Sequence, residues 1–152
     1  MLRRIALVSL VVLGSLLAGC ANTGATRSTG SELIGAWIVS SSRTSGVGKN
    51  LLTFSSDGTF FRSGDTHPTL SGGHGAWKRT SEGEFEATYI AFRFDENRKW
   101  VGSTLTRLRI KPGPGPNQFT GTAKSVRRDL EEKEVGAGES RLHGKRIEVD
   151  PT

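Results

Sequence analysis

Residues 51–63 read LLTFSSDGTFFRS, in which two runs of mixed apolar and polar residues flank the dipeptide Asp57-Gly58. Asp-Gly is a strong signal for a two-residue β-hairpin loop, because such a loop needs positive φ angles at its centre. With that loop Phe54 pairs with Phe61, and the alternation of a strand places Leu52, Phe54 and Phe61 on one face. We expect this face to point into the protein. The opposite face receives the remaining side chains, Thr53, Ser55, Phe60 and Arg62.

The rest of the chain continues this β pattern. Aromatic and β-branched residues alternate with polar ones, glycines are frequent, and no apolar stripe has helical spacing. The run KPGPGP at 111–116 predicts a loop, because proline cannot donate a hydrogen bond into a sheet. A ninth short strand, or a turn, is expected around 130–136. The predicted strands are residues 33–41, 50–56, 59–64, 73–80, 84–95, 99–110, 118–128 and 141–149.

Residues 84–110 predict a longer hairpin that turns at residues 95–98, Asp-Glu-Asn-Arg. On its water-facing side, Glu86 is the expected cross-strand partner of Arg107 and Arg109. The inward side combines Phe85, Ala87, Tyr89 and Ala91 from the first strand with Trp100, Thr104, Thr106 and Leu108 from the second.

Strict alternation in this hairpin leaves three apolar residues, Ile90, Phe92 and Phe94, on the outer side. Either a β-bulge changes the register within the strand, or these residues form an exposed apolar patch. Such a patch would pack on a loop, a partner or the membrane surface. We favour the bulge.

Strands joined in order by short turns predict an up-and-down sheet. A chain of this length removes its two exposed edges by closing about eight strands into a barrel. The interior of such a barrel holds side chains or one small ligand. One face of strand 118–128 carries Phe119 and three small residues, which leave room inside. The predicted fold is therefore all-β, an antiparallel up-and-down barrel of about eight strands.

The N-terminus shows the order of features found in secretory signals. Arg3 and Arg4 precede an apolar run at residues 5–18, which is shorter than the roughly 20 residues that span a bilayer. The run ends in LAGC, residues 17–20, which resembles the bacterial lipobox. The resemblance implies diacylglyceryl attachment to the Cys20 thiol, cleavage before it and acylation of the new amino group. A cleaved soluble export signal with a stray cysteine, and a single-pass anchor, are the alternatives.

The lipobox resemblance also implies an organisation and a location. We expect a signal peptide at 1–19, a lipidated flexible tether at 20–32 and a barrel domain at 33–152. Several acyl chains, such as palmitate, on Cys20 would hold the protein on a membrane of the bacterial cell envelope. Ala21 follows the cysteine, and resemblance to envelope lipoproteins then implies the periplasmic face of the outer membrane in a host with two membranes.

Composition narrows the classes of partner. Cys20 is the only cysteine, so no disulfide is expected. Loss of residues 1–19 removes two arginines and lowers the formal net charge from +6 to +4. The basic residues are dispersed, whereas a nucleic-acid binder needs a concentrated basic stripe, so no nucleic-acid partner is expected. The three histidines, His67, His74 and His143, lack the spacing of a metal ligand set, and neither a metal nor another cofactor is expected.

The first predicted strand contains Gly35-Ala36-Trp37, which resembles the G-x-W signature of the lipocalin-like, or calycin, β-barrels. This resemblance implies that Trp37 closes one end of the barrel. It also implies that an arginine near the last strand, Arg146 or Arg141, stacks across the indole ring in a cation–π contact.

The predicted function is that of a membrane-anchored envelope lipoprotein whose barrel binds or carries a small hydrophobic ligand. Aromatic side chains would line the lumen and polar ones would orient the ligand. The candidate contacts are Trp37, Phe54, Phe61, Tyr89, Arg93, Trp100 and Thr104. Two alternatives stay open: a structural or interaction module with a filled barrel, and an isomerase-type enzyme with His74 or Tyr89 as acid–base group. No nucleophile motif is present, so the sequence favours binding over catalysis.

Overall fold

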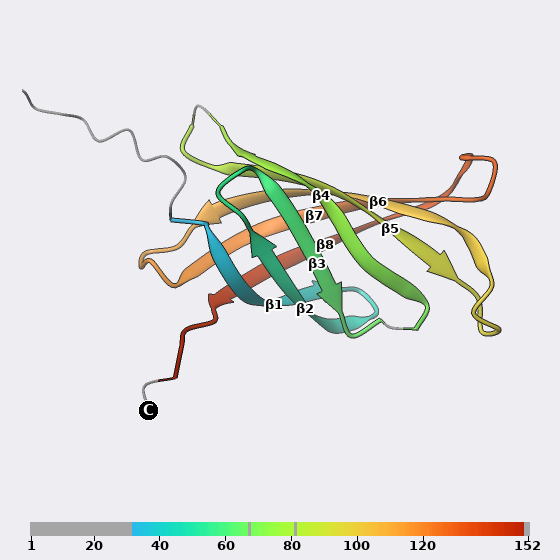
Figure 1. Cartoon of the computed structure of the whole chain (residues 1–152), viewed down its shortest axis with the longest axis horizontal. Helices are drawn as coiled ribbons and strands as arrows, with labels where there is room; N and C mark the ends of the chain where they lie inside the picture. Colours follow the sequence, from blue (N-terminus) through green and yellow to red (C-terminus); the bar gives the residue numbers. More distant parts are fainter. Residues whose placement is uncertain (1–31, 67, 81, 151–152) are drawn as a thin grey trace, which may run out of the picture.

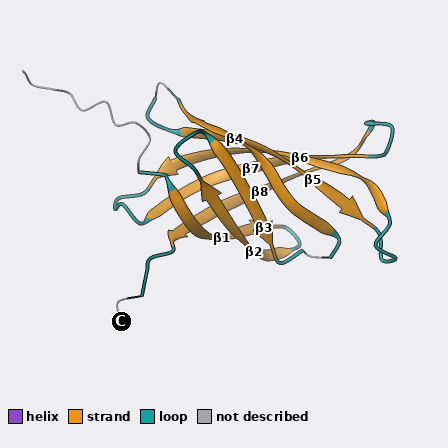
Figure 2. Cartoon of the chain, viewed as in Figure 1, coloured by secondary structure: helices purple, strands orange, loops and turns teal. Residues whose placement is uncertain are grey.

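Eight strands follow one another along the chain, each antiparallel to the next, and β8 pairs with β1 to close the barrel (Figure 1). The computed structural model describes residues 32–66, 68–80 and 82–150. Within these ranges the chain consists of strands and loops, as Figure 2 shows. The strands are β1 (Gly35–Arg43), β2 (Gly46–Phe54), β3 (Thr59–Gly64), β4 (Leu70–Arg79), β5 (Phe85–Phe94), β6 (Trp100–Pro112), β7 (Gln118–Arg128) and β8 (Glu134–Arg146).

This architecture confirms the predicted all-β up-and-down barrel of eight strands. The largest difference concerns the last strand, which begins at Glu134 and ends at Arg146 instead of covering residues 141–149. Residues 130–136, predicted as a ninth strand or a turn, form part of the β7–β8 turn and the first residues of β8. The predicted signal peptide (1–19), Cys20 and all but the last residue of the predicted tether (20–32) lie outside the described residues.

The barrel has two ends, which we name by the segments they carry. The closed end carries the start of β1, the end of β8 and the turns β2–β3, β4–β5 and β6–β7. The open end carries the turns β1–β2, β3–β4, β5–β6 and β7–β8. In Figure 1 the closed end lies on the left, near the C-terminus, and the tips of the β5–β6 and β7–β8 hairpins lie on the right.

Aromatic side chains fill the closed end. The ring centroids of Trp37 and Phe119 lie 4.9 Å apart, and those of Phe54 and Phe60 lie 4.8 Å apart. Such pairs contribute about 0.5–1.5 kcal/mol beyond the burial of their area. The largest fully buried side chains of the described residues belong to this end or to the wall beside it: Trp37, Phe54, Phe60, Phe85, Phe119, Ile110 and Val39.

A stacked tryptophan–arginine pair seals this end. The Arg146 guanidinium lies 4.3 Å from the centroid of the Trp37 ring, which confirms the stack expected for Arg146, whereas Arg141 is exposed. Arg146 also donates hydrogen bonds of 2.6 Å to the carbonyls of Ile34 and Glu32. Gly35 lies beneath the guanidinium at a φ of 125°, and a Cβ there would come within 2.7 Å of Arg146 Nη1. The backbone conformation therefore favours glycine at this position, two residues before Trp37.

The β2–β3 hairpin differs from its prediction by one residue. Ser55 and Thr59 flank a three-residue loop in which the Ser55 N–H donates to the Thr59 carbonyl and Gly58 adopts a φ of 86°. This is the hairpin type in which a residue of positive φ closes a type I turn. The loop pairs Phe54 with Phe60, and the predicted pairing of Phe54 with Phe61 is wrong.

The new register exchanges the two faces of β3. Phe60 and Arg62, predicted to face outward, are 0% and 6% exposed. Phe61, predicted to face inward, is 41% exposed, and its ring contacts His74 edge-on at 4.9 Å. A one-residue slip changes the face of every side chain in a strand. The one-residue difference in loop length therefore reverses the predicted faces of Phe60, Phe61 and Arg62 together.

The β5–β6 hairpin confirms one expectation and corrects another. Arg109 Nε lies 3.6 Å from a carboxylate oxygen of Glu86, as predicted for the water-facing side. Ile90 and Phe92, however, are 49% and 53% exposed, so the favoured bulge is wrong for them and the exposed apolar patch is present. A register shift does occur, but only between Arg93 and Phe94.

Beyond that shift Trp100 lies on the outer surface, with its ring 6.0 Å from Phe92, and its predicted inward position is wrong. Phe94 reaches the interior, where it contributes to the wall described below. Strict alternation predicts Phe94 on the outside and Trp100 on the inside, and the register shift reverses both positions.

Candidate functional site

The open half of the barrel encloses a cavity of about 450 Å³. This volume lies within the range of about 300–1,000 Å³ typical of small-molecule sites. Small side chains on β7 create the space, as predicted, because Ala123 and Ser125 point inward where larger residues would fill the lumen. The apolar part of the wall includes Val39, Leu52, Leu70, Phe94, Leu108, Ala123 and Leu142.

Arg62 is the most deeply placed charged group in this wall. Its side chain projects from β3 and is 6% exposed. Nε donates to Asn50 Oδ1 at 2.9 Å, and one terminal nitrogen, Nη2, donates to Thr66 Oγ1 at 3.1 Å. Asn50 is itself held by a 3.2 Å hydrogen bond from its Nδ2 to Ser41 Oγ. Two of the three guanidinium nitrogens are thus fixed by neutral partners.

The third nitrogen, Nη1, is buried and has no hydrogen-bond partner within the described part of the chain. A buried donor without a partner costs about 1–3 kcal/mol, and more when it is charged. A guanidinium keeps its charge in proteins, so it cannot reduce this cost by losing a proton. The site therefore contains a fixed positive charge with a free donor.

Other arginines add to this charge. Arg43, Arg93 and Arg127 also line the cavity, and none of them forms an ion pair with a carboxylate of the described residues. The acidic residue along this wall is Glu139, which is exposed and pairs in register with exposed Lys124. Within the ranges described, the lumen thus has an excess of positive charge.

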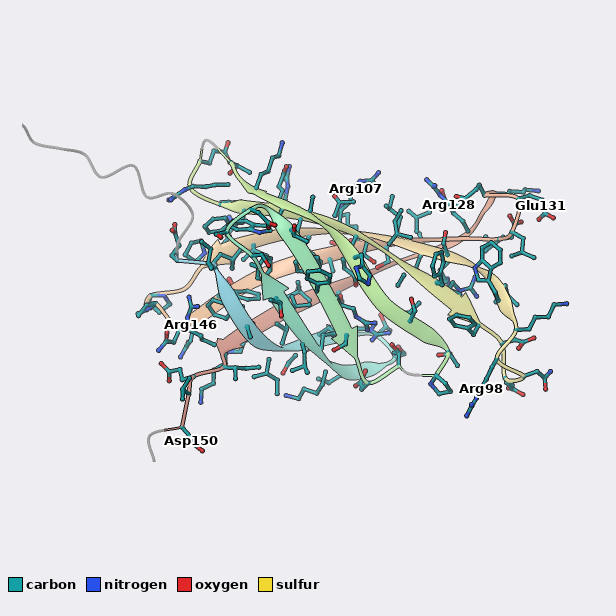
Figure 3. All side chains as sticks on the ribbon, in the orientation of Figure 1. Arg98, Arg107, Arg128, Glu131, Arg146 and Asp150 are labelled. Carbon is teal, nitrogen blue, oxygen red and sulfur yellow. The ribbon has the colours of Figure 1, made fainter. Side chains whose placement is uncertain are left out.

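On the outer surface, by contrast, cations lie close to an acidic residue. A second concavity, of about 890 Å³, lies over β4–β8 and has Lys78, Glu86 and Arg109 among its lining residues. There Glu86 lies 4.0 Å from Lys78 and 3.6 Å from Arg109, so acidic groups compensate part of the positive charge. In Figure 3 Arg107, which also lines this concavity, points away from the barrel.

Hydroxyl groups complete the lumen wall. Thr106 Oγ1 and Ser125 Oγ lie 2.9 Å apart and share a hydrogen bond. Thr104 and Thr106 are both buried, and Tyr89 packs with its ring centroid 5.5 Å from Phe60. Because a hydroxyl can act as donor or acceptor, this side can adapt to a polar group on a ligand.

The predicted ligand contacts separate into three groups. Tyr89, Arg93 and Thr104 line the cavity. Trp37 and Phe54 are packed into the closed-end core and do not reach the cavity wall. Phe61 and Trp100 lie on the outer surface, so their assignment to the lumen is corrected.

Sequence reasoning missed Arg62, together with Asn50 and Thr66, which hold it. A two-residue hairpin loop predicts Arg62 on the solvent face, whereas the three-residue loop places it inside. No signal within this strand could have revealed it. Phe60 and Phe61 are adjacent aromatic residues, either of which could face inward, and only the register of the neighbouring strands decides between them.

The other chemical groups offer less. His74, the suggested acid–base group, is exposed on the outer surface against Phe61, and His143 is exposed as well. His67 lies outside the described residues. No group of three or more His, Cys, Asp or Glu residues could hold a metal ion in residues 32–66, 68–80 and 82–150. In these same ranges no helix has the length and hydrophobicity needed to cross a membrane.

Comparisons with protein-family models, with curated proteins and with solved structures found no match to this chain. The arrangement of the lumen itself shows what it can do chemically. It can surround an apolar group with aliphatic side chains and offer a buried cationic donor and several hydroxyls to a polar group on the same molecule.

Proposed function

We propose that this protein is a membrane-anchored envelope lipoprotein whose barrel binds or carries a small hydrophobic or amphipathic molecule. The observation that carries the proposal is the cavity of about 450 Å³ with aliphatic residues in its wall, inside a barrel whose other end is closed by the Trp37–Arg146 stack. A lipocalin-like barrel with this arrangement is suited to holding one ligand at its open end.

The cavity also bears on the two alternatives. A structural module with a filled barrel would bury its inward side chains against one another, whereas Tyr89 and Thr104 here border unfilled space. An isomerase-type enzyme would use His74 or Tyr89 as its acid–base group; His74 lies outside the lumen, whereas Tyr89 lines it. Binding is the function that the geometry supports best.

The anchor is proposed on the residues before the barrel. The LAGC motif at 17–20 and the lone cysteine support lipidation of Cys20 and a location on the cell envelope, on the periplasmic face of the outer membrane in a host with two membranes. Growth with labelled palmitate, followed by purification, should give a labelled wild-type protein and an unlabelled Cys20→Ala variant. An unlabelled wild type would overturn the anchor and leave the barrel's function untouched.

Ligand binding is tested with N-phenyl-1-naphthylamine, a neutral apolar probe whose fluorescence rises on leaving water. We expect saturable binding by the purified full chain. Ser125→Phe should weaken it by about tenfold or more, because the ring would occupy the lumen. Val126→Phe, one residue away on the outward face of β7, is the matched control and should bind normally. Equal binding by both variants, with unchanged folding by circular dichroism, would place the probe outside the lumen and contradict the proposal.

A further inference from the structure

We infer that the lumen selects amphipathic molecules that carry one anionic group, and that Arg62 is the residue that holds this group. The inference rests on the proposed function, because it takes ligand binding in the lumen as given and names the class of ligand. The ligand is a small organic acid, such as a carboxylate or a sulfonate, with an apolar part.

The first argument is the state of Arg62. The residue is only 6% exposed, and two of its guanidinium nitrogens donate hydrogen bonds to Asn50 and Thr66. Both partners are neutral, so neither compensates the charge. Nη1 remains buried and without a partner in the described ranges, and it belongs to a residue that lines the cavity. The wall of the lumen thus contains a desolvated cation with one unpartnered donor, which an acceptor can reach once the side chains that cover Nη1 move aside.

The second argument is the charge of the route to Arg62. Arg43, Arg93 and Arg127 line the same cavity, none of them is paired with a described carboxylate, and exposed Glu139 is the one acidic residue of the described lining. Low-dielectric walls of a cavity in which one sign of charge dominates raise the local concentration of oppositely charged ligands. The field therefore favours entry of an anion and opposes entry of a cation.

The third argument concerns the size of the ligand. A single inorganic ion would leave most of a cavity of about 450 Å³ unfilled. The cavity that Arg62 lines also has apolar side chains in its wall, among them Val39, Leu52 and Leu142. A carboxylate that carries a short apolar chain matches both features of the cavity. The carboxylate accepts a charge-assisted hydrogen bond from the guanidinium, and the apolar chain packs against the aliphatic wall.

The test uses two probes that differ only in their charged group, 1-anilinonaphthalene-8-sulfonate and the neutral N-phenyl-1-naphthylamine. Arg62→Met keeps much of the length of the side chain and removes the donors. It should weaken binding of the sulfonate by about tenfold to a hundredfold, the range of a charge-assisted hydrogen bond. Binding of the neutral probe should change by less than about twofold. Arg107→Met, on the outer surface of β6, is the control and should change neither.

The outcomes separate the two proposals. If the wild type binds neither probe, ligand binding in the lumen is wrong. If it binds both, and Arg62→Met reduces both equally or neither, the lumen binds ligands but the anionic selectivity is overturned. Displacement of the sulfonate by millimolar inorganic phosphate alone would show a site for free ions and would overturn the amphipathic class.

A measurement on the wild type covers the case in which Arg62→Met fails to fold. In isotope-labelled protein, the side-chain Nε–H resonance of Arg62 should shift on titration with octanoate and not with octanol. These two molecules share the same chain length and differ in the acid. A resonance that responds to both alike, or to neither, would overturn the role of Arg62 even if both molecules bind.

Discussion

Each end of the barrel contains an arginine, and the two arginines differ in how fully their guanidinium donors are partnered. At the closed end Arg146 stacks on Trp37 and donates to the backbone carbonyls of Ile34 and Glu32. At the open end Arg62 is more deeply buried and leaves Nη1 without a partner among the described residues. Arg146 is placed to stabilise the fold. The environment of Arg62 does not favour stability, which is typical of a site kept for a ligand.

The hairpin turns show the same division. Four turns share one hydrogen-bond pattern over five residues, in which the N–H of the first residue donates to the carbonyl of the fifth. The fourth residue of each turn has a positive φ angle. At the closed end this residue is Gly58 or Gly83, whereas at the open end it is Arg98 at 61° or Glu132 at 62°. A left-handed conformation costs a residue with a side chain about 1–2 kcal/mol. The open end therefore carries backbone strain that the closed end avoids.

The largest effect expected from this comparison comes from removing a core aromatic residue. Trp37→Ala should lower the free energy of unfolding by about 3–5 kcal/mol, because it leaves a cavity in the packed closed end. Trp100→Ala, on the exposed surface, should change it by less than about 1 kcal/mol. Urea denaturation of both variants measures the difference. Similar losses for the two would show that the ends are not distinct in stability.

Next come the two arginines, each replaced by methionine. Arg146→Met should lower the free energy of unfolding by about 2 kcal/mol, since it loses the cation–π contact and charged hydrogen bonds to two carbonyls. Arg62→Met should change it by less than about 1 kcal/mol, because the lost bonds to Asn50 and Thr66 are offset by removal of a buried unpaired donor. Denaturation in the absence of ligand measures both. A greater loss at Arg62 would reverse the assignment of roles.

The turns provide a smaller effect of opposite sign at the two ends. Gly58→Ala should destabilise the protein by about 1 kcal/mol, because alanine is strained at positive φ. Arg98→Gly and Glu132→Gly should each stabilise it by up to about 1 kcal/mol, after allowance for the added freedom of the unfolded chain. Thermal unfolding gives the order of the three variants. Destabilisation by either open-end glycine would show that the native side chain contributes more than the strain removes.

The smallest effect concerns pH and the β2–β3 turn. The backbone N–H of Thr59 donates to Asp57 Oδ1 at 2.8 Å and lowers the pKa of this carboxyl from its ordinary value of 3.8. A lowered folded-state pKa stabilises the protein above the unfolded value, and this contribution is lost as the pH falls through the folded value. Asp57→Asn should therefore be less stable than the wild type at pH 7, and the difference should shrink below pH 3.8. A difference that is constant with pH would exclude the charge as its cause.

The sequence allowed the closed end to be predicted better than the open end. Trp37, Arg146 and the strand order follow from a short motif and from alternation, which local sequence reports well. The faces of Phe60, Phe61 and Arg62 depended on one residue of loop length, and that is decided by the register of neighbouring strands. Ile90 and Phe92 were misjudged because apolar side chains were assumed to avoid water, although folded proteins expose many of them.

The candidate site shows the same limit. Tyr89, Arg93 and Thr104 were found because strict alternation holds over most of β5 and β6. Arg62 could not be found in this way, because burial of a charged residue runs against composition rules and depends on Asn50 from another strand. Sequence patterns that describe stable folds therefore do not predict a site that departs from them.

The chain enters the barrel at the closed end, where β1 begins, and the cavity opens at the opposite end. The proposed anchor on Cys20 would therefore be joined, through the tether, to the end of the barrel opposite its mouth.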